Sequence, residues 1–358
     1  MAHLKLSELV KKFGANVALD GLSLDIADGE FFVLLGPTGA GKTTALRAIA
    51  GLEKMDQGAI EIGNQNVDGW SAAERDVALV FQYYSLYPRY SVYENLAFPL
   101  RARIRKFSEA EIKTRISKAA KTLRIEHLLE RKTDRLSGGE MQRVSIGRAI
   151  VREPRAFLMD EPLSNLDAKL REALRSELKD LQMKLGATFL FVTHDQVEAM
   201  SMGDRVGVMK EGRIVQVGTP YEIYNNPNSV FVASFVGSPA INFLPVEWAD
   251  GKAQLLNASI GLDLGSKGPK RSVTLGVRSE DVILDAKQPF AAKIHDVENH
   301  GVEKIVTLRS GKQLLRATVK SATPTSFESE VKFGFNPNKV HCFDSESGQR
   351  LASKANVL

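Results

Sequence analysis

The sequence predicts an α/β domain with a mixed sheet and a helical segment, followed by a smaller all-β domain. The first part is predicted because an apolar run at residues 31–35 leads into a glycine-rich loop and a helix, and further apolar runs follow. The second is predicted because short strand patterns separated by Gly, Asn and Pro take over near residue 237. A chain of 358 residues also exceeds the size at which one core usually stops growing.

The strands expected in the first domain are short apolar runs, or alternate apolar with polar residues as half-buried strands do. They are residues 3–9, 22–26, 31–35, 59–62, 77–81, 156–159, 188–193, 206–209 and 214–217. In the second domain the same patterns predict strands at 272–277, 281–284, 292–297, 305–308, 314–319 and 331–335. Such a series of short strands is typical of a small barrel or sandwich.

Helical patterns lie between the strands of the first domain, at 44–50 and broadly from 91 to 152. Ser108 with Glu111 forms a capping box that opens a helix. A later helix is predicted by leucines at 3–4 spacing with charges on the opposite face; they are Leu170, Leu174, Leu178, Leu181 and Leu185. The stripe lasts barely two heptads, so it favours core contact over a coiled coil. A shorter helix is expected at 196–202.

The composition is that of a folded protein with a mild positive charge. The net charge of +5 permits contact with anionic lipid or nucleic acid without demanding it. Cys342 is the single cysteine, so no intrachain disulfide can form, which fits a reducing compartment. No apolar run approaches the roughly 18 residues of a membrane span, and the start lacks a secretory signal. We expect a soluble, cytoplasmic protein whose membrane role would come through a partner.

A phosphate-binding loop is predicted directly after the strand at 31–35. Its glycines let backbone N–H groups point at phosphate oxygens, and the helix that follows adds positive potential. The residues expected to bind the nucleotide are Gly36, Pro37, Thr38, Gly39, Ala40, Gly41, Lys42, Thr43 and Thr44. Lys42 would reach the β- and γ-phosphates, and the Thr43 hydroxyl would ligate magnesium. The alternative is a glycine-rich turn with an incidental lysine.

Two acids follow the apolar strand at 156–159. If this strand lies beside that of the phosphate loop in a parallel sheet, Asp160 can hold the magnesium ion. Glu161 would then face the γ-phosphate and could polarise the attacking water. The alternative, a strand that ends in solvated acids, is common, and the phosphate loop is what favours the functional interpretation.

A second anion site is predicted at residues 136–140, where Ser137 precedes Gly138 and Gly139 at a helix start. One chain already has its phosphate loop, so a second site is redundant unless two chains share the nucleotide. The alternative is Ser137 as the N-cap of an ordinary helix, which explains the serine but not the glycine pair.

Together these motifs resemble the nucleotide-binding subunits of ABC transporters, across residues 3–236. Residues 136–140 match the family signature, and 164–167 match its D-loop, which ends in Asp167. His194 matches the switch histidine, Gln82 the Q-loop glutamine, and Phe13 the aromatic that stacks on adenine. The resemblance implies ATP and Mg²⁺ as cofactors, with Thr43, Gln82 and Asp160 at the metal.

The resemblance also implies a head-to-tail dimer of two copies of this chain. Each ATP would lie between the phosphate loop of one copy and Ser137, Gly138, Gly139 and Glu140 of the other. Glu161 would act as general base, while His194 would hold the γ-phosphate and the attacking water. One departure is Glu140, where glutamine is commoner, and its carboxylate could weaken nucleotide-driven closure.

The loop at residues 82–88 is rich in tyrosine and apolar for a surface turn. It could fill the seam between the sheet and the helical segment. In the family this region receives a cytoplasmic helix of the membrane-spanning permease, and Gln82 would link it to the magnesium site. We favour the coupling role, with individual tyrosines unassigned.

Residues 75–82 and 93–100 resemble the subgroup that serves bacterial carbohydrate importers, of the maltose or sn-glycerol-3-phosphate type. Residues 237–243, 276–281 and 341–344 resemble the OB-like (TOBE) regulatory domain of that subgroup, although Ser279 stands where proline is usual. We therefore expect an ABC ATPase domain at 1–236, with its helical subdomain at about 88–153, and an OB-like domain at 237–358.

The partners implied are two integral-membrane permeases and, indirectly, a periplasmic substrate-binding protein, at the cytoplasmic face of the bacterial inner membrane. Importers of iron, sulfate and polyamines have similar subunits and remain alternatives. A nucleic-acid-associated ABC ATPase is a more distant one. It is disfavoured because residues 44–135 lack sustained heptads, the chain has one cassette, and the C-terminal part lacks paired aromatic and basic residues. We expect no nucleic-acid partner.

Overall fold

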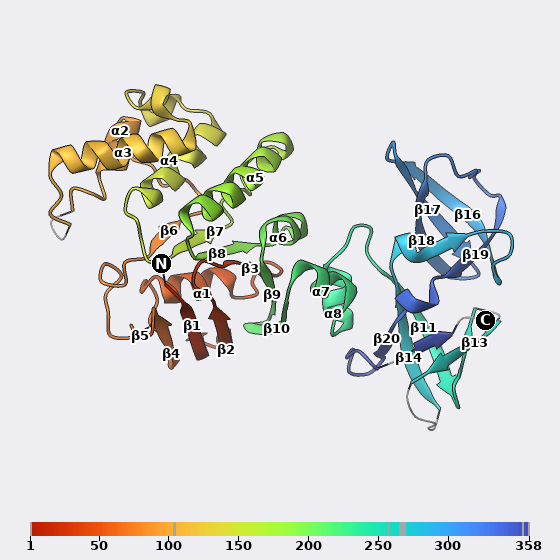
Figure 1. Cartoon of the computed structure of the whole chain (residues 1–358). Coiled ribbons are helices and arrows are strands. Elements are labelled where there is room, and N and C mark those ends of the chain that lie inside the picture. The colour runs from red at the N-terminus through yellow and green to blue at the C-terminus, as the bar shows by residue number, and fades with distance from the viewer. Residues whose placement is uncertain (1, 103–104, 257, 265–269, 353, 357–358) are drawn as a thin grey trace. The chain divides into compact units, whose positions relative to one another are not determined.

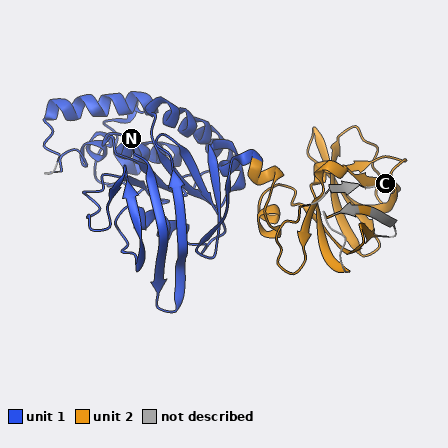
Figure 2. Ribbon diagram, turned by 60° about the horizontal axis from the view of Figure 1, so that its bottom comes forward, with its two compact units in different colours: residues 1–221 blue, residues 222–358 orange. Residues whose placement is uncertain are grey.

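The computed structural model describes residues 2–102, 105–256, 258–264, 270–352 and 354–356. The chain forms two compact units, residues 1–221 and 222–358, coloured separately in Figure 2. Each unit has its own sheets and core, which confirms the predicted α/β part followed by an all-β part. The boundary expected at 236/237 lies within the second unit, after two helices, and stays a prediction.

The sheet that positions the site has six strands among the described residues, in the order β10-β9-β3-β8-β7-β6. Their bounds are β3 Phe31–Leu35, β6 Ala78–Val80, β7 Phe157–Asp160, β8 Phe189–Thr193, β9 Arg205–Lys210 and β10 Arg213–Gly218. β3, β6, β7, β8 and β9 are parallel, and β10 pairs antiparallel with β9, so the sheet is mixed as predicted. Every residue of β3 and β8 is buried, which explains their unbroken apolar sequences. The carboxyl ends of β3, β7 and β8 therefore meet at one edge.

A second, antiparallel sheet has the order β2-β1-β4-β5. Its strands are β1 Leu4–Phe13, β2 Asn16–Ile26, β4 Gln57–Ile62 and β5 Gln65–Asn66. Helix α1, Lys42–Ile49, follows β3 (Figure 1), and its Leu46 belongs to the same core as Leu4 of β1 and Leu158 of β7. The two sheets and α1 thus share one core.

The remaining helices of this unit have bounds α2 Val92–Ala97, α3 Glu109–Leu123, α4 Gly138–Ile150, α5 Ala168–Leu185 and α6 Gln196–Met202. α2, α3 and α4 each begin with a capping box, at Ser91, Ser108 and Ser137. In α5, Leu174, Leu178 and Leu181 are buried, as the core interpretation predicts. Across the described residues, no helix is both long and apolar enough to cross a membrane.

Helix α7, Pro220–Asn225, crosses the boundary between the units, and helix α8, Val230–Phe235, lies in the second unit. The second unit continues in two antiparallel sheets ordered β20-β14-β11-β12-β13-β21 and β15-β19-β16-β17-β18. Their strands are β11 Asn242–Ala249, β12 Lys252–Leu255, β13 Ala258–Asp263, β14 Arg271–Val277, β15 Val282–Leu284, β16 Phe290–Asn299, β17 Glu303–Ser310, β18 Gln313–Lys320, β19 Glu330–Phe335, β20 His341–Asp344 and β21 Lys354–Asn356. Trp248 of one sheet and Phe333 of the other are buried in a common core, so the sheets pack face to face.

Candidate nucleotide-binding and hydrolytic site

The phosphate loop connects β3 to α1 and depends on glycine at two close approaches. A Cβ at Gly36 would meet the backbone oxygen of Met209 at 2.5 Å, and one at Gly41 would meet that of Ala18 at 2.3 Å. Gly41 also has a φ of 100°, which favours glycine. The loop is therefore packed against β9 and the β1–β2 hairpin, and it leads into the N-terminus of α1, a position that favours an anion.

Lys42 is the first residue of α1, and its ammonium is held inside the loop. Its Nζ donates to the backbone oxygens of Gly36 and Pro37 at 2.9 and 3.0 Å, and lies 3.6 Å from Glu161 Oε1. Burial lowers the pKa of Lys42, and the nearby Glu161 carboxylate opposes this shift. The cation is thus positioned next to the loop that would bind the phosphates.

Thr43, at the start of α1, lies next to Asp160, at the end of β7. The Thr43 hydroxyl donates to Asp160 Oδ1 at 2.9 Å, while burial raises the pKa of the Asp160 carboxyl. Hydroxyl and carboxylate oxygens are ligands that Mg²⁺ prefers. Within the described residues, no three His, Cys, Asp or Glu side chains gather as a metal site. Thr43 and Asp160 could therefore supply only part of a six-oxygen magnesium shell.

Gln82 follows β6 and contacts the D-loop segment. Its Nε2 donates to Ser164 Oγ at 3.2 Å, and its backbone oxygen accepts from Asn165 Nδ2 at 2.8 Å. Ser164 Oγ in turn donates to the backbone oxygen of Glu161 at 2.9 Å. The structure therefore joins Gln82 to the Glu161 turn, and its role as a magnesium ligand stays a prediction.

Glu161 and His194 form a pair at the ends of β7 and β8. Glu161 Oε2 lies 2.9 Å from His194 Nδ1, within hydrogen-bond distance. The Glu161 N–H donates to the backbone oxygen of Val192 at 3.0 Å, which continues the β7–β8 pairing, and Glu161 has a φ of 43°. Its carboxylate is mostly buried, whereas the His194 side chain is 52% exposed. One carboxylate thus faces both Lys42 and His194.

The serine-glycine segment at 137–139 begins α4. Glu140 Oε2 accepts from Ser137 N at 2.7 Å and from Ser137 Oγ at 2.8 Å, which completes the capping box. Hydrogen bonds from Ser137, the backbone one first, hold the pKa of Glu140 below its usual value. A Cβ on Gly139 would lie 2.6 Å from Leu170 Cδ2, so packing against α5 explains this glycine without a ligand.

Asp167 and Phe13, the other predicted nucleotide contacts, are placed by local structure. Asp167 is the N-cap of α5, and its Oδ1 accepts from Leu170 N at 3.0 Å. Phe13 ends β1 and is 48% exposed, with Lys11 Nζ 5.0 Å from its ring centroid. The same hairpin borders Gly41, so an exposed ring lies on the structure that touches the phosphate loop.

The tyrosine-rich loop at residues 82–88 is partly packed against neighbouring elements and partly exposed. The Tyr87 ring packs on Phe98 at a centroid distance of 4.5 Å, while Tyr83 is 73% exposed. Arg148 of α4 donates to the backbone oxygens of Ser85 and Tyr84. The loop is therefore fixed to α4 and exposes aromatic surface.

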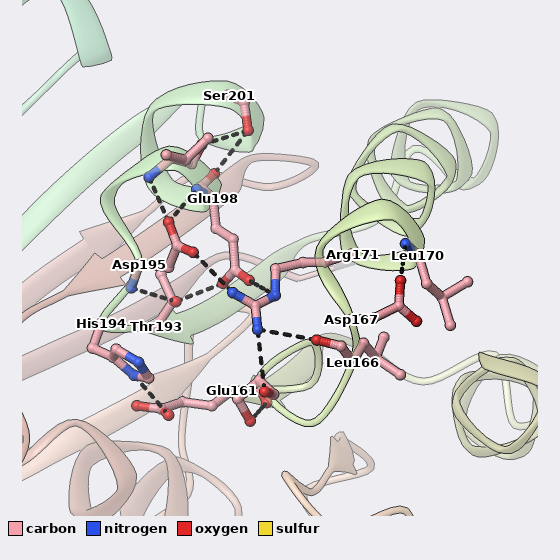
Figure 3. A network of polar contacts seen from close by, with 12 residues as sticks. Glu161, Leu166, Asp167, Leu170, Arg171, Thr193, His194, Asp195, Glu198 and Ser201 are labelled. Atoms are coloured by element: carbon pink, nitrogen blue, oxygen red, sulfur yellow. Dashed lines mark hydrogen bonds and ion pairs between the residues drawn. The ribbon is translucent and has the colours of Figure 1, made fainter. Parts of the chain in front are cut away.

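No sequence pattern singled out Arg171, Asp195 or Glu198, whose contacts connect the segment after β7, residues 161–166, with the segment after β8, residues 194–198 (Figure 3). Asp195 caps α6, and its spacing to Glu198 is that of a capping pair, the one signal that could have drawn attention to it. Arg171 carries no such signal, because its contacts depend on the fold.

Fold and site together define an ATPase of the P-loop class, in which a strand, a glycine-rich loop and a helix precede an acidic strand end. The family model described as ABC transporter matches residues 19–164. Two curated relatives are similar over 98% of this chain and the whole of their own length. They are the sn-glycerol-3-phosphate import ATP-binding protein UgpC of Ruegeria pomeroyi and the trehalose/maltose import ATP-binding protein MalK of Thermococcus litoralis, both 44% identical.

Among solved structures, cbiO1 from Clostridium perfringens, part of an ABC transporter complex, is 33% identical, with a TM-score of 0.57, over 62% of this chain and 89% of its own. A dimeric ATP-binding cassette in a post-hydrolysis state with ADP and Pi is 32% identical, with a TM-score of 0.55, over 61% and 98%. The chain belongs to the ABC transporter family, which confirms the resemblance seen in its motifs.

Proposed function

We propose that this protein is the ATP-hydrolysing subunit of a bacterial importer for a carbohydrate-type solute, a sugar or a glycerol phosphate. The observation that carries the proposal is the convergence of Lys42, Glu161 and His194 at one sheet edge. The solute class is supported by the relatives' import of sn-glycerol-3-phosphate and of trehalose and maltose.

In the proposed reaction the phosphate loop and Lys42 bind the triphosphate of ATP, and Phe13 stacks on adenine. Thr43 and Asp160 would hold Mg²⁺ together with Gln82, and the bound ion would neutralise charge on the phosphates. Glu161 accepts a proton from water as the water oxygen attacks the γ-phosphorus. The bond to the β–γ bridging oxygen breaks, giving ADP and phosphate, while His194 orients the water and the γ-phosphate.

We further propose that two copies act head to tail, with Ser137, Gly138, Gly139 and Glu140 of one copy and its Asp167 enclosing the ATP of the other. The solved cassettes that are dimeric support the association of two copies. ATP would then join the copies and hydrolysis would release them. The exposed aromatic surface of residues 83–87 would receive a cytoplasmic helix of each permease.

The proposed organisation assigns ATP chemistry to residues 1–236, with a helical subdomain at about 88–153, and regulation to an OB-like domain at 237–358. The protein would lie on the cytoplasmic face of the inner membrane, bound to two permeases that receive solute from a periplasmic binding protein.

Reconstitution tests this proposal. The chain and its two permeases are placed in proteoliposomes with ATP on the side of the ATPase, and uptake is measured for glycerol phosphate, disaccharides, spermidine, iron and sulfate. ATP-dependent uptake of a sugar or of glycerol phosphate is expected, and none in vesicles built with Glu161→Gln. Uptake confined to one of the other solutes would overturn the solute class.

A further inference from the structure

The guanidinium of Arg171 lies between the two loops that carry Glu161 and His194. Arg171 lies in the first turn of α5, with its side chain 31% exposed. Its Nη2 donates to the backbone oxygens of Ser164 and Leu166, both at 3.2 Å, and its Nη1 donates to Asp195 Oδ2 at 3.4 Å. In Figure 3 the Arg171 side chain reaches from its helix toward both loops.

The first set of contacts leads to Glu161. Ser164 folds back on the Glu161 backbone oxygen, which accepts from Ser164 N at 3.2 Å and from Ser164 Oγ at 2.9 Å. Arg171 holds the other side of this turn through the Ser164 carbonyl. The direction in which Glu161 presents its carboxylate is therefore tied to Arg171 through one tight turn.

The second set leads to His194, whose two neighbours are both held. Asp195 N donates to Thr193 Oγ1 at 2.9 Å, and Asp195 Oδ1 accepts from Val197 N at 2.7 Å as the cap of α6. The free oxygen of the same carboxylate receives Arg171. The His194 backbone is thus fixed between a strand end and a helix cap that Arg171 contacts.

A buried acid beneath the loops supports this arrangement. Glu198 is 3% exposed and accepts a hydrogen bond from the Thr193 hydroxyl, while Arg171 Nε lies 4.0 Å from its Oε1. Buried carboxylates need such a cation because burial disfavours their charge. Arg171 therefore contacts two carboxylates on the His194 side, Asp195 next to the histidine and Glu198 below Thr193.

We infer that Arg171 is a positioning residue for ATP hydrolysis, which sets the separation of the Glu161 turn and the His194 loop so that their side chains meet. The inference rests on the hydrolytic roles proposed above for those two residues. Arginine suits this task because its planar fork presents several fixed donors, whereas a lysine presents one compact charge. A displacement of about 1 Å at such a site can lower turnover about 10²-fold.

A merely structural role makes a different prediction. An arginine that only stabilises α5 would, when replaced, lower the melting temperature and the active fraction, and change ATP affinity and turnover together. The contacts that hold Lys42 in the phosphate loop involve Gly36, Pro37 and Glu161 rather than Arg171. A positioning role therefore predicts lower kcat with unchanged ATP binding.

The test compares Arg171→Gln, Arg171→Lys and Asp195→Asn in the full chain, with ATP affinity, kcat and melting temperature measured for each. The matched control is Arg115→Gln in α3, because Arg115 also pairs with a carboxylate, Glu153 at 2.9 Å, donates to a backbone oxygen, and is 26% exposed. Asparagine at 195 can still cap α6, so Asp195→Asn removes the charge and keeps the helix start.

We expect Arg171→Gln and Asp195→Asn each to lower kcat about 10²-fold at unchanged ATP affinity. Arg171→Lys should lower kcat less, and the control Arg115→Gln should leave kcat unchanged. The double variant Arg171→Gln/Asp195→Asn should have a kcat only slightly lower than that of either single variant, because both substitutions break the same Arg171–Asp195 contact. Wild-type kcat in Arg171→Gln, or equal loss of affinity and kcat, overturns the inference. If Arg171→Gln does not fold, Asp195→Asn decides alone. A wild-type chain without ATPase activity would instead refute the proposed function, and the inference with it.

Discussion

Replacing Glu140 by glutamine should change stability and ATP-driven closure in opposite directions. The Glu140 carboxylate accepts two hydrogen bonds from Ser137 at the start of α4, and its pKa is lowered. Glutamine keeps an acceptor but loses the charge that interacts with the helix dipole, which is worth about 0.3–1 kcal/mol at an exposed site. For a unit of this size we expect a melting temperature about 1–3 °C lower at neutral pH.

The stability effect should depend on pH with a defined sign. A carboxyl whose pKa is lowered by folding stabilises the folded state above its ordinary value of 4.5, and this contribution is lost as the pH falls through the folded pKa. Calorimetry of the wild type and Glu140→Gln should therefore show a difference at pH 7 that vanishes in acid. Glu211→Gln, in an exposed turn, is the control for loss of one charge.

The closure effect follows from repulsion between the Glu140 carboxylate and the triphosphate that would bind across the proposed dimer. Two like charges about 4 Å apart in water repel by about 1 kcal/mol, or about fivefold in affinity. The ATP concentration for half-maximal dimer formation, measured by light scattering, should fall about fivefold in Glu140→Gln. An unchanged concentration, or a raised melting temperature at pH 7, would refute the reasoning.

Three other variants test the rest of the site. Glu161→Gln should bind ATP normally and form a long-lived ATP dimer with turnover about 10²–10⁴-fold lower, and near-normal phosphate release would exclude a general-base role. Lys42→Ala removes a buried cation from the loop and should weaken ATP binding in calorimetric titration, so unchanged affinity and turnover would argue against phosphate contact. Tyr83→Glu places a charge on a side chain that is 73% exposed, so the isolated chain should keep its ATPase activity while reconstituted transport is lost. Persistent transport would remove this tyrosine from the coupling surface.

The strands that position the site were predictable because burial on both faces demands unbroken apolar sequence, as in Phe31–Leu35 and Phe189–Thr193. Helices α7 and α8 were missed because six residues span less than two turns and show no clear period. β11 was missed although its residues alternate, because Pro245 within it argues against a strand.

The phosphate loop, the acids at 160–161 and the segment 136–140 could be found from sequence because each is a local pattern. The contacts of Arg171 could not, because Asp195 and Ser164 reach it only through the parallel pairing of β7 with β8. Gly139 was attributed to anion binding alone, and its packing against Leu170 depends on the approach of α4 to α5.

The backbone of Glu161, with its φ of 43°, has a consequence for engineering. An L-residue in the left-handed region costs about 1–2 kcal/mol that glycine avoids. Glu161→Gly would relieve this backbone cost, but it would also remove the carboxylate that meets Lys42 and His194 and leave the buried Lys42 cation without its neighbouring charge. The backbone strain at Glu161 is thus retained together with the carboxylate to which we assign the general-base role, so a stabilised variant of the chain is best sought elsewhere.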